Sequence, residues 1–194
     1  MRGNKREKIL KAALKVIARE GFFHSKVEDI AGEAGVATGT PYLYFENKDD
    51  ILISIFEEEM VPIIEKIQRE VDSCTTCTKK IVTFVKCQLQ MIEENPDMAQ
   101  LLEVELRQSS KFMRGYRGGT FKKYLDILGN AFAEGQKAGE FRGDINPSLF
   151  KQMVFGAVDQ ISMNWTLSRS KKYTLKTSGE QIVEVILNGI SNQS

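Results

Sequence analysis

Apolar residues recur at the spacing of an α-helix along nearly the whole chain, and we find no segment that alternates apolar and polar residues as a half-buried strand does. The chain has 194 residues, of which 42% are hydrophobic and 27% charged, so it is able to bury a sizeable core. The pattern predicts an all-α protein of about nine helices. The first apolar stripe stops at Gly21 and consists of Ile9, Leu10, Ala13, Leu14 and Ile17.

Capping signals predict two short helices after the first one. Ser25 and Glu28 match a capping box, in which a hydroxyl and a carboxylate satisfy free amides at a helix start, so a helix is expected over 26–34. Thr38 is a suitable N-cap for a third helix over 38–44. A tight turn between these two helices, with small residues where they approach, has helix-turn-helix proportions, although many helical proteins contain similar hairpins.

The rest of the chain is expected to form longer helices. We predict a small domain over 1–47 and a larger helical domain over 48–194. The signals in the larger domain are a helix opening at Asn47–Asp50 with a kink at Pro62, a helix at about Thr78–Glu94, a restart at Asn95-Pro96, a helix at about Lys111–Ala138 kinked near Gly115, Gly118 and Gly119, a cap at Asn146-Pro147, and two apolar stripes at Phe150–Trp165 and Ile182–Ile190.

Several classes of function are disfavoured by the residues present. A single histidine, His24, with no catalytic triad pattern and no phosphate-cradling glycine loop argues against an enzyme. Cys74 and Cys77 have the spacing of a redox or metal pair but lack the further ligands that zinc needs, so no metal is expected. There is no secretory signal or membrane span, and we expect a cytoplasmic protein. The net charge of +1 gives no hint of nucleic acid, although residues 1–26 are rich in lysine and arginine.

A specific resemblance begins at residue 30. The run Ile30-Ala31-Gly32-Glu33-Ala34-Gly35-Val36-Ala37-Thr38-Gly39-Thr40-Pro41-Tyr42-Leu43-Tyr44-Phe45, followed by Lys48 and Ile51-Leu52, resembles the signature of the TetR family of bacterial transcriptional regulators. The likeness covers about the first 55 residues and many fixed positions. Pro41 departs from the pattern, because the family usually has an aliphatic residue there. The resemblance implies a DNA-binding helix-turn-helix joined to a helical body.

The resemblance assigns roles to the residues of the motif. A recognition helix presents its N-terminal side chains to base edges in the major groove, and here these are Thr38, Thr40, Pro41 and Leu43. Tyr42, Tyr44 and Lys48 resemble the family's phosphate contacts, although both tyrosines also suit core packing. Ser25 and Lys26, at the start of the second helix, are expected to hold another phosphate.

TetR-like proteins form dimers through their last two long helices, and the apolar stripes of this chain suit that role. A homodimer would match a palindromic operator with two half-sites. The same residues also suit the core of a single chain. The residues expected at the dimer interface are Phe150, Val154, Val158, Ile161, Ile182, Ile186 and Ile190.

The expected ligand follows from a second, broader resemblance. The segments 42–54, 103–110 and 153–160 look like those of TetR-type regulators of fatty-acid degradation, which release DNA when they bind long-chain acyl-CoA. No cofactor is expected, and the effector would be this thioester. Apolar side chains would line an acyl tunnel and a cationic cluster would hold the coenzyme head. These residues are Met91, Met98, Leu102, Leu106, Met113, Phe121, Leu125, Leu128, Met153 and Met163, with Arg107, Lys111, Arg114 and Arg117 as the cations.

Two alternatives stay open. The apolar set is also consistent with a plain core, and the cations with a solvated face. A TetR-type repressor with this fold could instead respond to a cationic drug or an aromatic metabolite, in which case acidic residues would be expected inside the pocket. A helical scaffold without DNA binding would leave the pattern of residues 30–52 unexplained.

Overall fold

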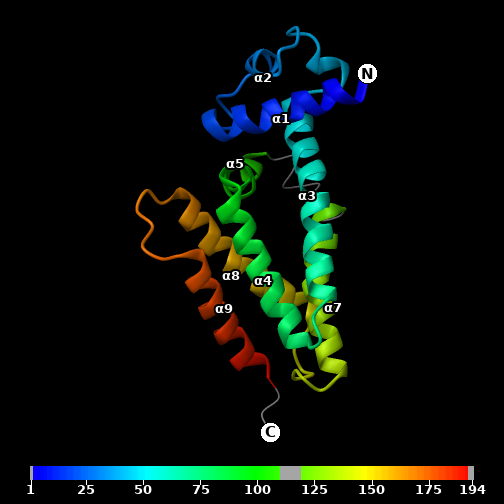
Figure 1. Cartoon of the computed structure of the whole chain (residues 1–194), viewed down its shortest axis with the longest axis vertical. Helices are drawn as coiled ribbons and strands as arrows, with labels where there is room; N and C mark the ends of the chain where they lie inside the picture. Colours follow the sequence, from blue (N-terminus) through cyan, green and yellow to red (C-terminus); the bar gives the residue numbers. More distant parts are fainter. Residues whose placement is uncertain (1, 110–118, 192–194) are drawn as a thin grey trace. The chain divides into compact units, whose positions relative to one another are not determined.

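The structure is a computed structural model that describes residues 2–109 and 119–191 (Figure 1). These residues form eight α-helices with short 3-10 and π-helical turns, and they contain no β-strand beyond one isolated bridge between Phe141 and Ser191. The all-α class is therefore confirmed. The elements are α1 Arg2–Glu20, α2 Val27–Ala34, η1 Pro41–Leu43, α3 Lys48–Asp72, α4 Cys77–Glu94, α5 Pro96–Gln100, η2 Leu101–Glu105, η3 Leu106–Gln108, α7 Thr120–Lys137, α8 Pro147–Leu167 and α9 Leu175–Ile190.

The chain divides into two compact units. Unit 1 consists of Met1–Val61 and Asn95–Arg117, and unit 2 consists of Pro62–Glu94 and Gly118–Ser194. This division differs from the boundary expected after residue 47, because α3 is one continuous helix whose first turns pack into unit 1. The functional boundary after residue 47 stays a prediction.

Unit 1 is built around α1. The helix packs against α2 on one side, and α5 and η2 also contact it (Figure 1). Its apolar stripe is completely buried at Ile9, Ala13 and Ile17, as is Ile30 of α2. Burial of such side chains contributes about 1.5–3 kcal/mol each, so the stripe that predicts the helix also holds the unit together.

Unit 2 is built around α4, which contacts α7, α8 and α9 (Figure 1). Its centre is a stack of aromatic rings, in which the Phe132 ring lies 5.4 Å from that of Phe141 and 3.9 Å from that of Phe150. Gly135 makes room for this stack, since a Cβ there would lie 2.1 Å from the Phe141 ring. These contacts give unit 2 a core of its own.

Two local predictions in unit 1 are wrong in register or form. The N-cap of α2 is Lys26 and not Ser25, because the backbone N–H of Lys26 donates to Asp29 and the Ser25 hydroxyl donates to the carbonyl of Phe22. The expected third helix over 38–44 is a turn followed by the 3-10 helix η1, with no side-chain cap.

The long helices of the body agree better with the sequence. α4 begins one residue before the expected Thr78, and Asn146 caps α8 by accepting a hydrogen bond from the backbone N–H of Ser148 at 2.8 Å. α3 continues through Pro62. α7 begins at Thr120, and the start and kink that we expected over 111–118 lie outside the described residues.

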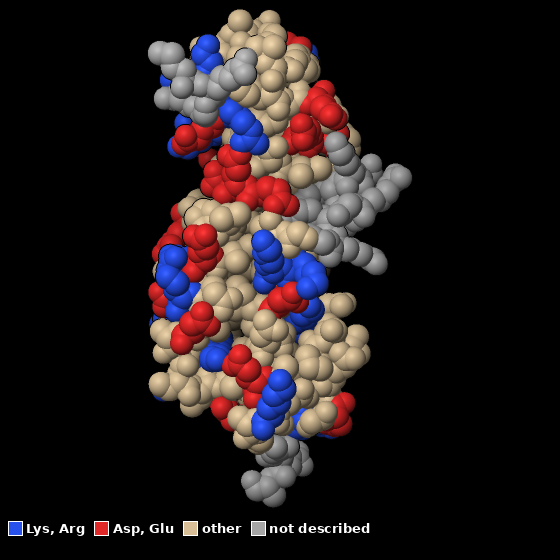
Figure 2. All heavy atoms as spheres, turned by 90° about the vertical axis from the view of Figure 1, so that its right-hand side faces the viewer, with Lys and Arg blue, Asp and Glu red and all other residues tan. Residues whose placement is uncertain are grey.

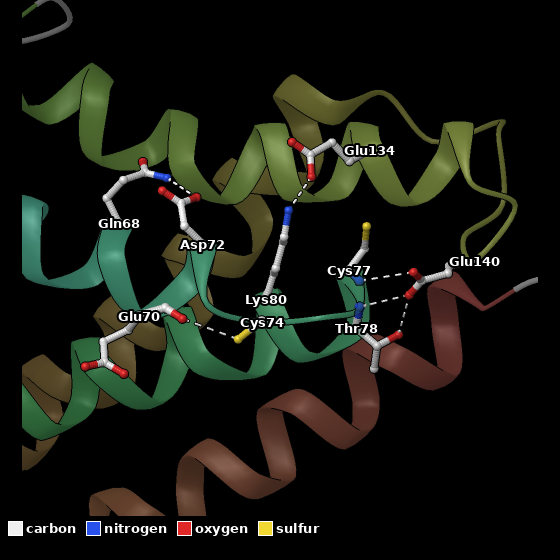
Figure 3. A network of polar contacts seen from close by, with 9 residues as sticks. All are labelled: Gln68, Glu70, Asp72, Cys74, Cys77, Thr78, Lys80, Glu134 and Glu140. Atoms are coloured by element: carbon white, nitrogen blue, oxygen red, sulfur yellow. Dashed lines mark hydrogen bonds and ion pairs between the residues drawn. The ribbon is translucent and has the colours of Figure 1, made fainter.

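Within residues 2–109 and 119–191, no helix is both long and apolar enough to cross a membrane. The same ranges contain no cluster of His, Cys, Asp and Glu side chains that could hold a metal ion. Cys74 and Cys77 are free thiols (Figure 3). The Cys74 thiol lies 3.4 Å from the Glu70 carbonyl oxygen and 3.3 Å from the Thr83 hydroxyl.

Candidate DNA-binding site and effector-binding residues

The turn after α2 has the geometry that the sequence predicts. Gly35 adopts a left-handed conformation (φ 66°), and its N–H and that of Val36 bond back to Gly32 and Ala31. Glycine adopts this conformation without a steric penalty, so the helix ends there. Ile30 and Ala31 are completely buried beneath the turn. The chain therefore leaves α2 in a fixed direction toward the recognition segment, which we define as residues 38–44.

The recognition segment presents some of its expected base-reading side chains and hides another. Leu43 is 80% exposed, Thr38 is exposed and Thr40 is half-buried. Pro41, in contrast, is buried as the first residue of η1. A buried ring has no access to a base, so the base contact expected for Pro41 is not supported by its position.

Two of the expected phosphate-binding residues are engaged inside unit 1. The Lys48 ammonium donates to the carbonyl oxygens of Phe22 and Phe23 and, at 2.9 Å, to that of Ser25. Burial lowers the pKa of Lys48, although the charge of Asp49 opposes the shift. Ser25 is buried, with its hydroxyl 3.0 Å from the Phe22 carbonyl. Both residues thus stabilise the corner between α1 and α2 and are poorly placed to meet a phosphate.

The remaining candidates for phosphate contact are accessible. Lys26 is exposed at the start of α2, Tyr42 is 54% exposed and Tyr44 is half-buried beside Phe45. Basic and acidic side chains are interspersed on the face drawn in Figure 2, as the net charge of +1 leads one to expect. The described residues of that face thus form no broad basic surface.

The residues expected around an effector belong to both units. Within unit 1, Met98 and Leu106 are buried and Leu102 is half-buried. Within unit 2, Leu128 is buried, and half-buried positions are occupied by Met91, Phe121, Leu125 and Met163. Met153 is the exception, because it is 60% exposed on α8 and so does not line an interior tunnel of this chain.

Only one of the four expected cations is described. Arg107 donates from Nε to the Glu103 carbonyl at 2.8 Å and lies 3.6 Å from the Glu103 carboxylate. Its guanidinium is therefore at least partly engaged within its own turn. The other expected head-group residues, Lys111, Arg114 and Arg117, and the expected lining residue Met113, lie outside the described residues.

Most residues expected at a dimer interface form the core of the single chain. Ile161 and Ile186 are half-buried, and the other five are buried without any partner chain. Periodicity did not distinguish the face of α8 that packs inward from the face that remains free. The five buried residues are Phe150, Val154, Val158, Ile182 and Ile190.

The free faces of α8 and α9 contain apolar residues that we did not expect at an interface. Val185 of α9 is 74% exposed, and α8 has a stripe of exposed positions at helical spacing. This second stripe consists of Leu149, Met153, Gly156, Ala157, Gln160, Asn164 and Leu167. Its i, i+4, i+7 spacing was the feature of the sequence from which it could have been recognised.

Glu105 was also missed. It is 2% exposed and accepts a hydrogen bond from the backbone N–H of Phe22 at 2.6 Å. The only sequence signal was two carboxylates, Glu103 and Glu105, within an otherwise apolar run.

The helix-turn-helix and helical body are those of a class of DNA-binding regulators, and comparison with known families agrees. Residues 9–55 match "Bacterial regulatory proteins, tetR family", and residues 56–189 match "YsiA-like protein, C-terminal region" of the TetR type. The chain belongs to the TetR family, whose helix-turn-helix binds DNA.

Its similar relatives include regulators of fatty-acid metabolism. The chain is 35% identical over 185 residues to the fatty acid metabolism regulator protein of Bacillus subtilis, covering 95% of each sequence. A crystal structure of FadR from Bacillus subtilis in complex with stearoyl-CoA is similar with a TM-score of 0.87, 35% identity, and coverage of 95% of this chain and 98% of that one. FadR from Bacillus halodurans is similar with a TM-score of 0.86, 34% identity, and coverage of 95% of each chain.

Proposed function

We propose that this protein is a transcriptional repressor of fatty-acid-degradation genes that leaves its operator when it binds a long-chain acyl-CoA. The observation that carries the proposal is the similarity along nearly the whole chain to FadR, including the structure with stearoyl-CoA. The likeness includes the body that would hold the ligand as well as the DNA-binding motif. A drug or aromatic metabolite as effector has no comparable support.

The DNA contacts are proposed from exposure. Leu43 and the hydroxyls of Thr38 and Thr40 would meet base edges, because these side chains project from the recognition segment. Tyr42, Tyr44 and Lys26 would contact phosphates and set the register of the motif on the duplex. Lys48 and Ser25 act indirectly, by holding the corner that precedes α2.

A homodimer would bind a palindromic operator. The exposed stripe of α8 and Val185 of α9 are the surfaces that we propose for the dimer interface, since large apolar side chains are exposed there. Two recognition segments about 34–36 Å apart would then read successive major grooves. We expect such a regulator to act in the bacterial cytoplasm, where its operator would lie.

The effector would supply enough free energy to change the DNA affinity. Burial of an acyl chain gains about 0.8 kcal/mol per methylene, or on the order of 10 kcal/mol for a long chain. Allosteric coupling typically needs about 1–3 kcal/mol. Only a fraction of the free energy gained by burying the acyl chain must therefore differ between the DNA-bound and the DNA-free conformation of the protein. We propose a binding function without catalysis, in keeping with relatives that are transcriptional regulators.

A binding measurement tests the effector. Palmitoyl-CoA, palmitate and coenzyme A are titrated separately by calorimetry, with Trp165 fluorescence as a second signal. We expect palmitoyl-CoA to bind at micromolar concentration or tighter, and the two fragments to bind far more weakly. Absence of palmitoyl-CoA binding by a protein that still binds DNA would overturn the effector and leave the regulator intact.

A matched pair of variants locates the acyl site. Leu125→Trp fills space at a half-buried position proposed to line the tunnel, whereas Tyr173→Trp places the same side chain at an exposed position between α8 and α9. We expect the first to weaken palmitoyl-CoA binding about tenfold or more and the second to leave it unchanged. Equal binding by both variants would remove Leu125 from the site.

A charge on the proposed dimer surface tests the assembly. Val185→Glu places a carboxylate at a position that is 74% exposed in the single chain, so the fold tolerates it. We expect monomers by sedimentation and a large loss of affinity for the palindrome. Lys176→Glu, which is also exposed on α9, is the control and should stay dimeric. A dimeric Val185→Glu protein would exclude this surface.

A further inference from the structure

The corner between α1 and α2 is held by side chains and not by a repeating backbone pattern. α1 ends at Glu20 and α2 begins at Val27; backbone hydrogen bonds join Gly21 to Ile17 and Ser25 to Gly21, and the other polar groups of residues 21–26 need partners elsewhere. The chain turns at Gly21 in a left-handed conformation (φ 82°), which favours glycine. This turn presents the N–H of Phe22 to the carboxylate of Glu105, which lies 83 residues further along the chain.

Glu105 is buried at this corner. Its Oε2 accepts the Phe22 N–H at 2.6 Å, and its Oε1 accepts the side-chain amide of Gln100 at 2.9 Å. A Cβ on Gly21 would lie 3.7 Å from the same carboxylate, so backbone and acid are in close contact. A carboxylate at 2% exposure is costly unless donors satisfy it, and a backbone N–H to a charged acceptor is a strong bond.

The carbonyl group of Phe22 is also held by hydrogen bonds from side chains. Its carbonyl oxygen accepts hydrogen bonds from the Lys48 ammonium and, at 3.0 Å, from the Ser25 hydroxyl. The Lys48 ammonium also lies 4.6 Å from the centroid of the Phe22 ring. Residues from η2, α3 and the corner itself therefore converge on Phe22, and α2 starts only five residues later.

We propose that Glu105 is a positioning residue for DNA binding. It touches no DNA; it fixes the Phe22 peptide group and with it the entry into α2, on which the direction of the recognition segment depends. The inference rests on the proposed DNA-binding function and deepens it, because it places a determinant of DNA affinity about 60 residues beyond the helix-turn-helix motif.

A role of Glu105 in positioning and a purely electrostatic role predict opposite changes in DNA affinity when its charge is removed. Removal of a negative charge from a DNA-binding unit by itself strengthens DNA binding, because phosphate is repelled less. Loss of positioning weakens it. Glu105→Ala removes the charge and the acceptor, whereas Glu105→Gln removes the charge and keeps an amide oxygen that can accept the Phe22 N–H.

The test compares operator affinity among four full-length proteins. The operator is a duplex selected from random sequences with the wild-type protein, and affinity is measured by fluorescence anisotropy over a range of salt concentrations. Circular dichroism gives the folded fraction, so that affinity refers to folded molecules. The control is Glu140→Ala, which removes a carboxylate that accepts the backbone N–H groups of Cys77 and Thr78 in unit 2.

We expect Glu105→Ala to bind the operator at least about tenfold more weakly, with an unchanged salt slope because the residues that contact phosphate remain. Glu105→Gln should recover affinity to within about threefold of wild type, and Glu140→Ala should match wild type. Wild-type affinity or tighter in Glu105→Ala overturns the inference, as does a Glu105→Gln protein that is as weak as Glu105→Ala. A wild-type protein that selects no duplex would overturn DNA binding itself.

Discussion

Each unit uses a carboxylate to bind backbone N–H groups far away in the sequence, and the two cases differ in what they hold. In unit 1, Glu105 accepts the N–H of Phe22 at 2.6 Å. In unit 2, Glu140 accepts those of Cys77 and Thr78 at 3.1 and 3.0 Å and the Thr78 hydroxyl at 3.2 Å (Figure 3). Glu105 is buried and holds an irregular corner, whereas half-buried Glu140 caps the start of α4.

The difference shows how each unit keeps its shape. α4 is already fixed by packing, with Ile81, Phe84 and Val85 buried along it, so Glu140 adds a modest stabilisation to an element that is otherwise secure. The corner of unit 1 depends on polar side chains that meet at Phe22. We infer that unit 2 resists single polar substitutions, whereas the geometry of unit 1 is sensitive to them.

The largest expected effect is on the aromatic core of unit 2. Phe132→Ala removes the middle ring of the stack with Phe141 and Phe150 and should lower the free energy of unfolding by about 3–5 kcal/mol. Urea unfolding measures this. Phe23→Ala, at a position that is 67% exposed, is the control and should change it by less than about 0.5 kcal/mol. A loss below about 1 kcal/mol for Phe132→Ala would contradict a core held by this stack.

The cap of α4 should contribute less and should depend on pH. Glu140→Ala is expected to cost about 1–2 kcal/mol at neutral pH. The N–H of Cys77 and then the groups of Thr78 lower the pKa of Glu140, against the effect of burial. Its contribution is therefore complete above the unfolded pKa of about 4.3 and is lost as the pH falls through the lower folded pKa.

Urea unfolding of wild type and Glu140→Ala from pH 7 down to pH 3 checks this dependence. The difference between the two proteins should stay constant down to about pH 4.3 and shrink below it. A difference that grows on acidification would show that the carboxylate is not held in its charged form.

The smallest expected effect distinguishes anchoring from phosphate contact at Lys48. Lys48→Met should lower the free energy of unfolding by about 1 kcal/mol, because the carbonyls of Phe22, Phe23 and Ser25 lose their donor. The salt slope of operator binding should not change. Lys26→Met, at an exposed position, should reduce that slope by about 1.8, because the proposed dimer loses two phosphate contacts at about 0.9 each. A reduced slope for Lys48→Met would restore it as a phosphate contact.

The sequence predicted those parts of the fold that local chemistry decides. The stripe ending at Ile17, the tight turn after α2 and the Asn146 cap depend only on neighbouring residues, so each could be recognised without knowledge of the tertiary structure. The capping box was displaced by one residue because Asp29, and not Glu28, accepts the N-cap N–H, and the N-cap is Lys26, which the Ser/Thr rule does not predict.

The candidate site could be predicted only in part. Recognition-segment residues followed from the family motif, but the burial of Pro41 depends on η1 and not on the motif. Apolar periodicity on α8 predicted Val154 and Val158 as interface residues although they face the chain's own core, because both faces of this helix contain apolar residues. The role of Glu105 needs a contact across 83 residues that no local pattern contains.

The central claim is that an acyl-CoA controls operator binding, and one titration tests it most directly. Palmitoyl-CoA is added to the wild-type protein on a fluorescent operator duplex, with coenzyme A and palmitate in parallel, and anisotropy reports the bound fraction. The account predicts that palmitoyl-CoA weakens operator binding about tenfold or more while neither fragment changes it. Operator that stays bound when calorimetry shows the protein saturated with palmitoyl-CoA would contradict it.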